Sequence, residues 1–332
     1  MKKYKLLNSG VKVNRELEEY EKIHICHRVA DILRRKYPYL SWNYLQIITD
    51  LYNTKMYVVK DENKVSLVNY IYQDQSIYFA EEKDLKRVDE NVIHECIHKL
   101  QDRRNKHGRL MQLGNCEFTL SKVKGLAFNE AANQYIVAEL LNRKYKEINL
   151  NNIKLKLPKD SYYLITANLM KQIMMLIEED EILVKSTISA NNDFNYKMID
   201  YFGEKEFYNI RENFDKIENL QIRGNVKEAE EIYFKTQKII YQNYFNKQLK
   251  YIDSLSEIDE IKQKLEKYFS FIETTEFLKE DNEEYKIFAG AILFKEESIK
   301  NKYALVVVKN NSIRKMFNKL REFITVGKNS EY

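Results

Sequence analysis

Glycine and proline are scarce in this chain of 332 residues, which contains 8 glycines and 2 prolines. Average usage is about 7% for glycine and about 5% for proline, so collagen-like, linker-like and low-complexity proteins are excluded. An all-β protein that needs a tight turn about every ten residues is excluded as well. Because glycine and proline interrupt helices, their scarcity predicts long helices. Three glycines nevertheless lie close together, at Gly108, Gly114 and Gly125, and each marks a place where the backbone does something unusual.

Cysteine is also rare, and the 3 cysteines are too few and too odd in number for a disulfide framework. The basic N-terminal segment lacks the apolar core of a signal peptide, and apolar runs such as residues 304–308 are too short to cross a bilayer. The charge excess is only 55 − 50 = +5, with both signs spread along the chain. This pattern indicates a solvated surface. We therefore expect a cytoplasmic protein that contacts neither membranes nor nucleic acid.

The spacing of apolar residues predicts an α+β chain that is predominantly helical. Helices are expected at residues 11–36, 42–51, 84–104, 126–143, 162–178, 204–219, 226–244, 258–269 and 313–323. Segments rich in Val, Ile and Tyr predict a small antiparallel meander at residues 55–60, 64–72 and 76–80, and two later strands at 285–294 and 303–309. We expect three parts: an N-terminal α/β part (1–82), a helical part (83–223) and a part with C-terminal helices and a ββα-like segment (224–332).

An H-E-x-x-H motif lies within the predicted helix at residues 84–104, in the sequence His94-Glu95-Cys96-Ile97-His98. Residues four apart share one helix face, so both imidazoles can reach one metal ion at about 2.0–2.1 Å. Glu95 is rotated by about 100° from His94 and lies beside the metal rather than on it. There it can take a proton from a zinc-activated water and pass it to a leaving amine. The motif therefore predicts a zinc site with Glu95 as general base.

Two histidines leave a zinc ion one protein ligand short. The extended metzincin motif is absent, because the residue six positions after His98 is Arg104. Glu130 is the expected third ligand, since it lies on the apolar face of the predicted helix at 126–143, where a lone carboxylate is costly unless a cation meets it. Glu117, in the glycine-bearing segment, is the competing third ligand. In the remaining alternative, Glu130 pairs with a lysine or caps a helix.

H-E-x-x-H followed 32 residues later by a helical glutamate resembles the gluzincin zinc metallopeptidases, whose site geometry is thermolysin-like. The resemblance covers residues 76–142. It implies a zincin-like fold in which residues 76–80 lead into the motif helix, and a peptide or protein substrate that adds as an extended strand along the sheet edge. The stretch 130–141 also resembles the glutamate helix of compact bacterial gluzincins that cleave repressors and anti-toxin-type regulators.

The chain departs from the gluzincin pattern at one position. Many gluzincins carry an aspartate four residues after the ligand glutamate, where it holds a zinc histidine, and this chain has Gln134 there. The glutamine oxygen can still accept an imidazole N–H, but without charge, and such changes beside a metal site can lower affinity or activity by about 10- to 100-fold.

The sequence thus predicts a zinc metallopeptidase with one Zn²⁺ per chain, bound by His94, His98 and Glu130. Two alternatives remain: a zinc-binding but non-proteolytic regulatory or interaction module of zincin fold, and an interaction protein whose C-terminal helices do the main work. A hydrogen-bond donor for the developing oxyanion is also needed, and the sequence leaves it open among Tyr135, Tyr162, Tyr163 and His107. Other residues with reactive side chains are expected to be structural, namely Cys26, Cys96, Cys116, His24 and His27.

Overall fold

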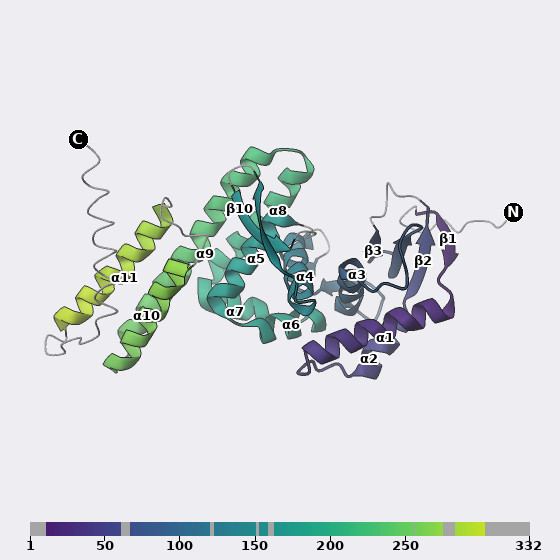
Figure 1. The fold of residues 1–332 in the computed structure, drawn as a ribbon, viewed down its shortest axis with the longest axis horizontal. Coiled ribbons are helices and arrows are strands. Elements are labelled where there is room, and N and C mark those ends of the chain that lie inside the picture. The colour runs from purple at the N-terminus through teal and green to yellow at the C-terminus, as the bar shows by residue number, and fades with distance from the viewer. Residues whose placement is uncertain are drawn as a thin grey trace. The chain divides into compact units, whose positions relative to one another are not determined.

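The computed structural model describes residues 11–60, 67–119, 123–150, 153–158, 163–255, 257–274 and 283–302. Its internal contacts divide the chain into two compact units, residues 1–236 and 237–332. The division falls within helix α9 (Val226–Ser254), and each unit is described by itself. The chain is α+β and mostly helical, with small sheets, which confirms the α+β, predominantly helical part of the prediction (Figure 1).

The first sheet has four strands in the order β1-β2-β4-β3. These strands are β1 (Val13–Glu16), β2 (Lys55–Val59), β3 (Val68–Ile71) and β4 (Ser76–Ala80). The predicted antiparallel meander is wrong in its order, because β2 and β4 pair in parallel and β3 lies on the edge. The reason is burial: every residue of β4 is buried, so β4 takes the central position that a meander would have given to β3.

Two helices of the N-terminal region, α1 (Glu19–Lys36) and α2 (Tyr44–Tyr52), pack on each other (Figure 1). The helix expected from residue 11 begins only at Glu19, because the residues before it form β1. The start of α1 is fixed by a capping box, in which the Glu18 backbone N–H donates to the Glu21 side chain at 2.8 Å.

Helix α3 (Glu90–Gln101) carries the H-E-x-x-H motif, and α4 (Leu126–Leu140) carries Glu130. Both helices were predicted, with longer bounds. The segment between them forms a second, antiparallel sheet, which was not predicted. Its strands are β5 (Asp102–Arg104), β6 (Leu110–Leu113), β7 (Cys116–Phe118) and β8 (Val123–Lys124). They have two to four residues each, too few for an alternating pattern to show.

The clustered glycines allow close approaches around this second sheet. Gly114 (φ +55°) and Gly125 (φ +75°) have left-handed backbones, and a Cβ on them would lie 2.1 Å from Asn129 Oδ1 and 2.6 Å from Arg211 Nη2, respectively. Gly125 also opens α4, which has no side-chain cap of its own. Asp215 of helix α8 (Glu204–Ile222) supplies the cap, since its carboxylate accepts two backbone N–H groups at that end, both at 2.9 Å.

The rest of the first unit is a two-stranded hairpin followed by helices. The hairpin consists of β9 (Tyr145–Leu150) and β10 (Ile153–Pro158), and it was not predicted. Between it and α8 lie α5 (Leu164–Ile177), α6 (Asp180–Ser189) and α7 (Asp193–Phe202). Helices α5 and α8 confirm the two helices expected there. Phe128 of α4 anchors the core, with its ring centroid 5.3–6.1 Å from those of Phe194, Phe207 and Phe214.

The second unit contains the end of α9, α10 (Ile258–Thr274) and α11 (Glu283–Lys302). The helices predicted at 226–244 and 258–269 are confirmed. The strand predicted at 285–294 is wrong, because these residues belong to α11, where the buried Phe288 and Ile292 are one turn apart. Phe288 packs on the rings of Tyr241 and Phe245. The strand predicted at 303–309 and the helix predicted at 313–323 lie outside the described residues.

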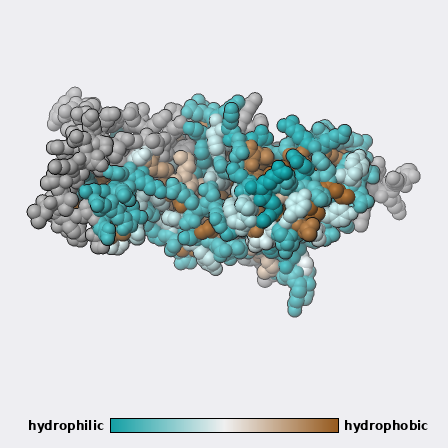
Figure 2. All heavy atoms as spheres, turned by 60° about the horizontal axis from the view of Figure 1, so that its bottom comes forward, coloured by the Kyte–Doolittle hydropathy of each residue, from teal (hydrophilic) through white to brown (hydrophobic). Residues whose placement is uncertain are grey.

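None of the helices in the described part of the chain is both long and apolar enough to cross a membrane. Figure 2 shows a face on which hydrophilic side chains predominate and hydrophobic ones are scattered between them.

Candidate metal centre

Helices α3 and α4 bring three of the predicted site residues together. His94 Nε2 and His98 Nε2 are 3.0 Å apart, and Glu130 Oε2 lies 3.2 Å from the first and 3.0 Å from the second. Both histidines are buried, and the Glu130 side chain is 13% exposed. Among the residues that the structure describes, this triad is the one group of three or more His, Cys, Asp or Glu side chains that could hold a metal ion.

The spacing within the triad fits a metal ion. Ligand atoms around a four-coordinate zinc at about 2.0–2.1 Å lie about 3.3 Å from one another, and the three measured distances are 3.0–3.2 Å. Two imidazole nitrogens and one carboxylate oxygen also form a donor set that transition metals accept. The fold therefore brings His94, His98 and Glu130, which the sequence predicted as ligands, into a group that could hold a metal ion.

The triad is strongly coupled electrostatically. Burial alone would raise the pKa of Glu130, but the charge of His98 and hydrogen bonds from both imidazoles outweigh it, and the pKa lies far below its usual range. Burial likewise would lower the pKa of His98, but the Glu130 carboxylate outweighs it and raises this pKa to about 9. At neutral pH the ion-free triad therefore holds a carboxylate and a protonated His98, and a metal ion must displace that proton.

A buried amide network orients the His98 ring. Its Nδ1 lies 3.2 Å from Gln101 Oε1, which also accepts from Asn129 Nδ2 at 3.1 Å. Gln101 Nε2 in turn donates to Asn133 Oδ1 at 2.6 Å. The Gln101 oxygen can accept a proton from His98 Nδ1, while Asn133 Nδ2, a donor, lies 3.2 Å from both ring nitrogens. His98 Nε2 faces the triad. All three amide residues are fully buried.

His94 lacks an equivalent partner in the described structure. Its buried Nδ1 has no hydrogen bond there, and neither has the buried Oε1 of Gln134. Gln134 was predicted to hold a zinc histidine. Its amide nitrogen donates instead to Glu90 Oε1 at 2.5 Å, and Arg143 Nε lies 3.4 Å from the other oxygen of that carboxylate.

Glu95 lies beside the triad and is not part of it, as the motif predicts. Its Oε2 accepts a hydrogen bond from the backbone N–H of Tyr70, on the edge strand β3, at 2.6 Å. Burial raises the pKa of Glu95, although the two histidines and the Tyr70 N–H act in the opposite direction. A carboxylate with a raised pKa next to a metal site is suited to accept a proton and release it again.

The other candidates from the sequence have different partners. Glu117, the competing third ligand, forms an ion pair with Arg211 at 3.3 Å. The Tyr135 hydroxyl donates to Asp180 Oδ1 at 2.7 Å. His107 is exposed and Tyr163 is 38% exposed at the start of α5, while Tyr162 lies outside the described residues. The choice of an oxyanion donor therefore stays open.

His24 and His27 lie exposed on helix α1, as predicted, and neither belongs to the group that could hold a metal ion. His24 Nε2 contacts the Lys86 carbonyl at 3.0 Å, and His27 Nδ1 contacts the Tyr44 hydroxyl at 2.9 Å. All 3 cysteines are free and buried. Burial raises the pKa of each thiol, to about 12 for Cys26 and Cys116, so none is a ready nucleophile.

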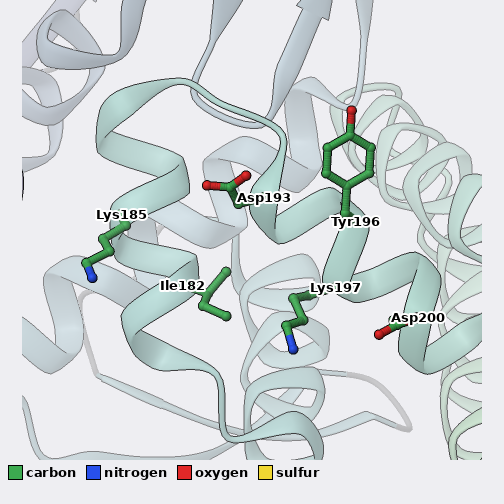
Figure 3. A pocket seen from close by; sticks show the side chains of 6 residues that line it. All are labelled: Ile182, Lys185, Asp193, Tyr196, Lys197 and Asp200. Carbon is green, nitrogen blue, oxygen red and sulfur yellow. The ribbon is translucent and has the colours of Figure 1, made fainter.

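A surface hollow between α6 and α7 lies apart from this chemistry (Figure 3). It contains two lysines and two aspartates, and no member of the triad lines it. Its lining residues are Ile182, Lys185, Asp193, Tyr196, Lys197 and Asp200. Lys185 and Lys197 are already paired with Glu181 and Glu179.

Sequence reasoning missed three groups that contact the site: Gln101, the Tyr70 N–H, and Asn133, whose Nδ2 lies 3.2 Å from both ring nitrogens of His98. Gln101 could have been found, because it follows His98 by three positions and so shares its helix face. Tyr70 carries no such signal, because it meets Glu95 through a backbone N–H 25 positions earlier in the chain.

Comparisons with protein-family profiles, with curated proteins and with solved structures found no match to this chain. The interpretation of the metal centre therefore depends on its own residues and geometry.

Proposed function

We propose that the protein is a zinc metallopeptidase of gluzincin type with a zincin-like fold. The observation that carries the proposal is the arrangement of four side chains. His94, His98 and Glu130 offer three ligand atoms 3.0–3.2 Å apart, and Glu95 projects from the same helix without joining them. Three protein ligands with a neighbouring carboxylate are the donor set of catalytic zinc sites, whereas structural sites have four protein ligands.

The chemistry follows from the roles of these residues. Zinc held by the triad would supply Lewis acidity, which polarises a carbonyl group and makes water a stronger acid. Glu95 would accept one proton from the attacking water as the new carbon–oxygen bond forms. It would return this proton to the amide nitrogen as the carbon–nitrogen bond breaks, which leaves a carboxylic acid and an amine. The raised pKa of Glu95 favours the first transfer, because it makes the carboxylate a stronger base.

The edge strand β3 supports a peptide substrate. In an antiparallel pair, successive residues alternate between bonding the partner strand and facing away from it. The Ala80 N–H donates to the Leu67 carbonyl at 3.0 Å, so Leu67 bonds to β4 and, by this alternation, Tyr70 does not. The Tyr70 N–H therefore faces away from β4, and it donates to Glu95. An extended peptide that adds along β3 would pass directly beside the general base.

Metal analysis and peptide cleavage test the proposal. Purified protein should contain about one zinc per chain, and the His94→Ala variant should lose it. A peptide library should be cleaved by the zinc-loaded protein. Glu95→Gln should abolish this cleavage and keep the zinc. A protein that binds no zinc, or whose cleavage survives Glu95→Gln, would contradict the proposal.

A second candidate is a zinc-binding module without peptidase activity. The observation that favours it is the environment of the two histidines, since neither has a carboxylate partner on its Nδ1 and Gln134 is turned to Glu90. Such a site binds metal through a less basic ligand pair. The two candidates differ in one result: the module would bind zinc and leave every peptide in the library intact.

A further inference from the structure

A partly buried cluster of three side chains connects the edge strand β3 to the end of the motif helix. The Tyr70 hydroxyl donates to Asp102 Oδ2 at 2.6 Å. Arg104 donates two hydrogen bonds to the same carboxylate, from Nε to Oδ1 at 2.7 Å and from Nη2 to Oδ2 at 2.8 Å. Arg104 also donates to the carbonyls of Tyr72 and Gly108. We call Tyr70, Asp102 and Arg104 the Asp102 clamp.

The contacts of the Asp102 clamp restrict the movement of its side chains. The Asp102 and Arg104 side chains are 4% and 17% exposed, so their bidentate ion pair is poorly screened by water and has a defined geometry. Burial and the Asp102 charge raise the pKa of Tyr70 far above its usual range, so its hydroxyl stays protonated and donates. Tyr70 is thereby fixed at its side-chain end.

Tyr70 is also fixed at its main-chain end, where its N–H donates to Glu95. Asp102 directly follows α3, seven positions after Glu95 and so two helical turns further on. Tyr70 of β3 therefore contacts both Glu95, within α3, and Asp102, directly after α3. The clamp sets the position of this strand relative to α3, and the Tyr70 N–H sets the direction of the Glu95 carboxylate.

We propose that Asp102 is a positioning residue: through Tyr70 and Arg104 it holds the β3 main chain so that the Tyr70 N–H keeps the Glu95 carboxylate beside the metal centre. This inference rests on the proposed function where it concerns catalysis. The structural link from Asp102 to the Tyr70 N–H does not depend on that function and is measured separately.

The experiment compares three variants of the full chain. Tyr70→Phe removes one hydroxyl from the clamp, and Asp102→Asn keeps the shape of the carboxylate but removes its charge. Tyr78→Phe is the matched control. It removes a hydroxyl that donates to the Asp74 carboxylate at 2.9 Å, on the opposite face of the same sheet.

Hydrogen exchange of the Tyr70 amide in the zinc-free protein is the first readout. Both clamp variants should speed this exchange by about tenfold, because β3 is no longer fixed to Asp102 and the amide N–H is held less firmly against the Glu95 carboxylate. The control should leave it unchanged. Unchanged exchange in both clamp variants would overturn the proposal, whether or not the protein is a peptidase. If Asp102→Asn does not fold, the isosteric Tyr70→Phe variant decides the result.

Kinetics of the zinc-loaded protein are the second readout. The clamp variants should lower kcat by about 10- to 100-fold through misplacement of Glu95, with KM and zinc content close to those of the wild type. A loss no larger than that of Tyr78→Phe, or a loss confined to KM, would overturn the catalytic part of the proposal. A wild-type protein without peptidase activity would refute the proposed function instead, and the exchange result would still decide the role of Asp102.

Discussion

The proton on His98 predicts that zinc binding at the proposed site depends on pH. Glu130 raises the pKa of His98 from 6.5 to about 9 in the ion-free protein. The ion pair between protonated His98 and Glu130 stabilises the ion-free protein fully below about pH 6.5, and this stabilisation is lost as the pH rises through about 9. Zinc competes with this proton, so its apparent affinity changes in the opposite direction and increases with pH.

The size of the effect follows from the two pKa units between pH 7 and the pKa of His98. At pH 7 nearly every ion-free site is protonated, and each unit corresponds to about 1.4 kcal/mol. Zinc affinity at pH 7 should therefore be about 100-fold lower than at a pH above 9, and it should increase about tenfold per unit between pH 6.5 and 8.5. About one proton should be released for each zinc bound at pH 7.

Calorimetry in two buffers of different ionisation enthalpy measures the released proton, and competition with a chelator measures the affinity at each pH. His98→Ala should remove most of the binding. His24→Ala is the matched control, because His24 is exposed and contacts only the Lys86 carbonyl in the hydrogen bonds described; it should release the same proton as the wild type. Binding without proton release, or an affinity that varies less than threefold from pH 6.5 to 8.5, would refute the reasoning.

Three further predictions concern the structure around the site. Gln101→Met should lower zinc affinity by about 10- to 100-fold, because His98 loses the amide oxygen that lies 3.2 Å from its Nδ1. Gly114→Ala should destabilise the fold by about 2–4 kcal/mol in denaturant unfolding, since the added Cβ would lie 2.1 Å from a buried amide oxygen at a positive φ. Asp215→Ala should lower stability by about 0.5–2 kcal/mol, because it removes the cap of α4.

Each of these has a result that would contradict it. Gly108→Ala is the control for Gly114→Ala: it has the same kind of left-handed backbone (φ +77°) but open space around the added carbon, and it should cost only about 1 kcal/mol. Equal losses in the two variants would show that the close approach is unimportant. Unchanged zinc affinity in Gln101→Met would exclude its role as the His98 acceptor. Unfolding of Asp215→Ala at the wild-type denaturant concentration would exclude the tertiary cap.

The sequence by itself determined the local parts of this protein. The spacing of four between His94 and His98 places both imidazoles on one turn of a helix wherever that helix lies. The scarcity of glycine and proline predicted a mainly helical chain, and the helices α3, α4, α5, α8, α9 and α10 were expected. These are properties of neighbouring residues, which a periodic pattern records directly.

Tertiary structure decided everything that depends on distant residues. The parallel pairing of β2 with β4 follows from which strand must be buried, and only the packed core settles that. The strands between α3 and α4 have only two to four residues, too few for a periodic pattern in the sequence. They form because each pairs with a neighbouring strand. Residues 285–294 form a helix in which Phe288 and Ile292, one turn apart, are both buried.

The site shows the same division. The ligand identities were readable because histidine and glutamate on apolar helix faces need a shared task, and α3 and α4 then bring them to within 3.2 Å of one another. The contact of Glu95 with the Tyr70 N–H was not readable, because every residue has a backbone N–H and sequence does not distinguish one from another. Only the packing of an edge strand against the motif helix selects which N–H faces the carboxylate.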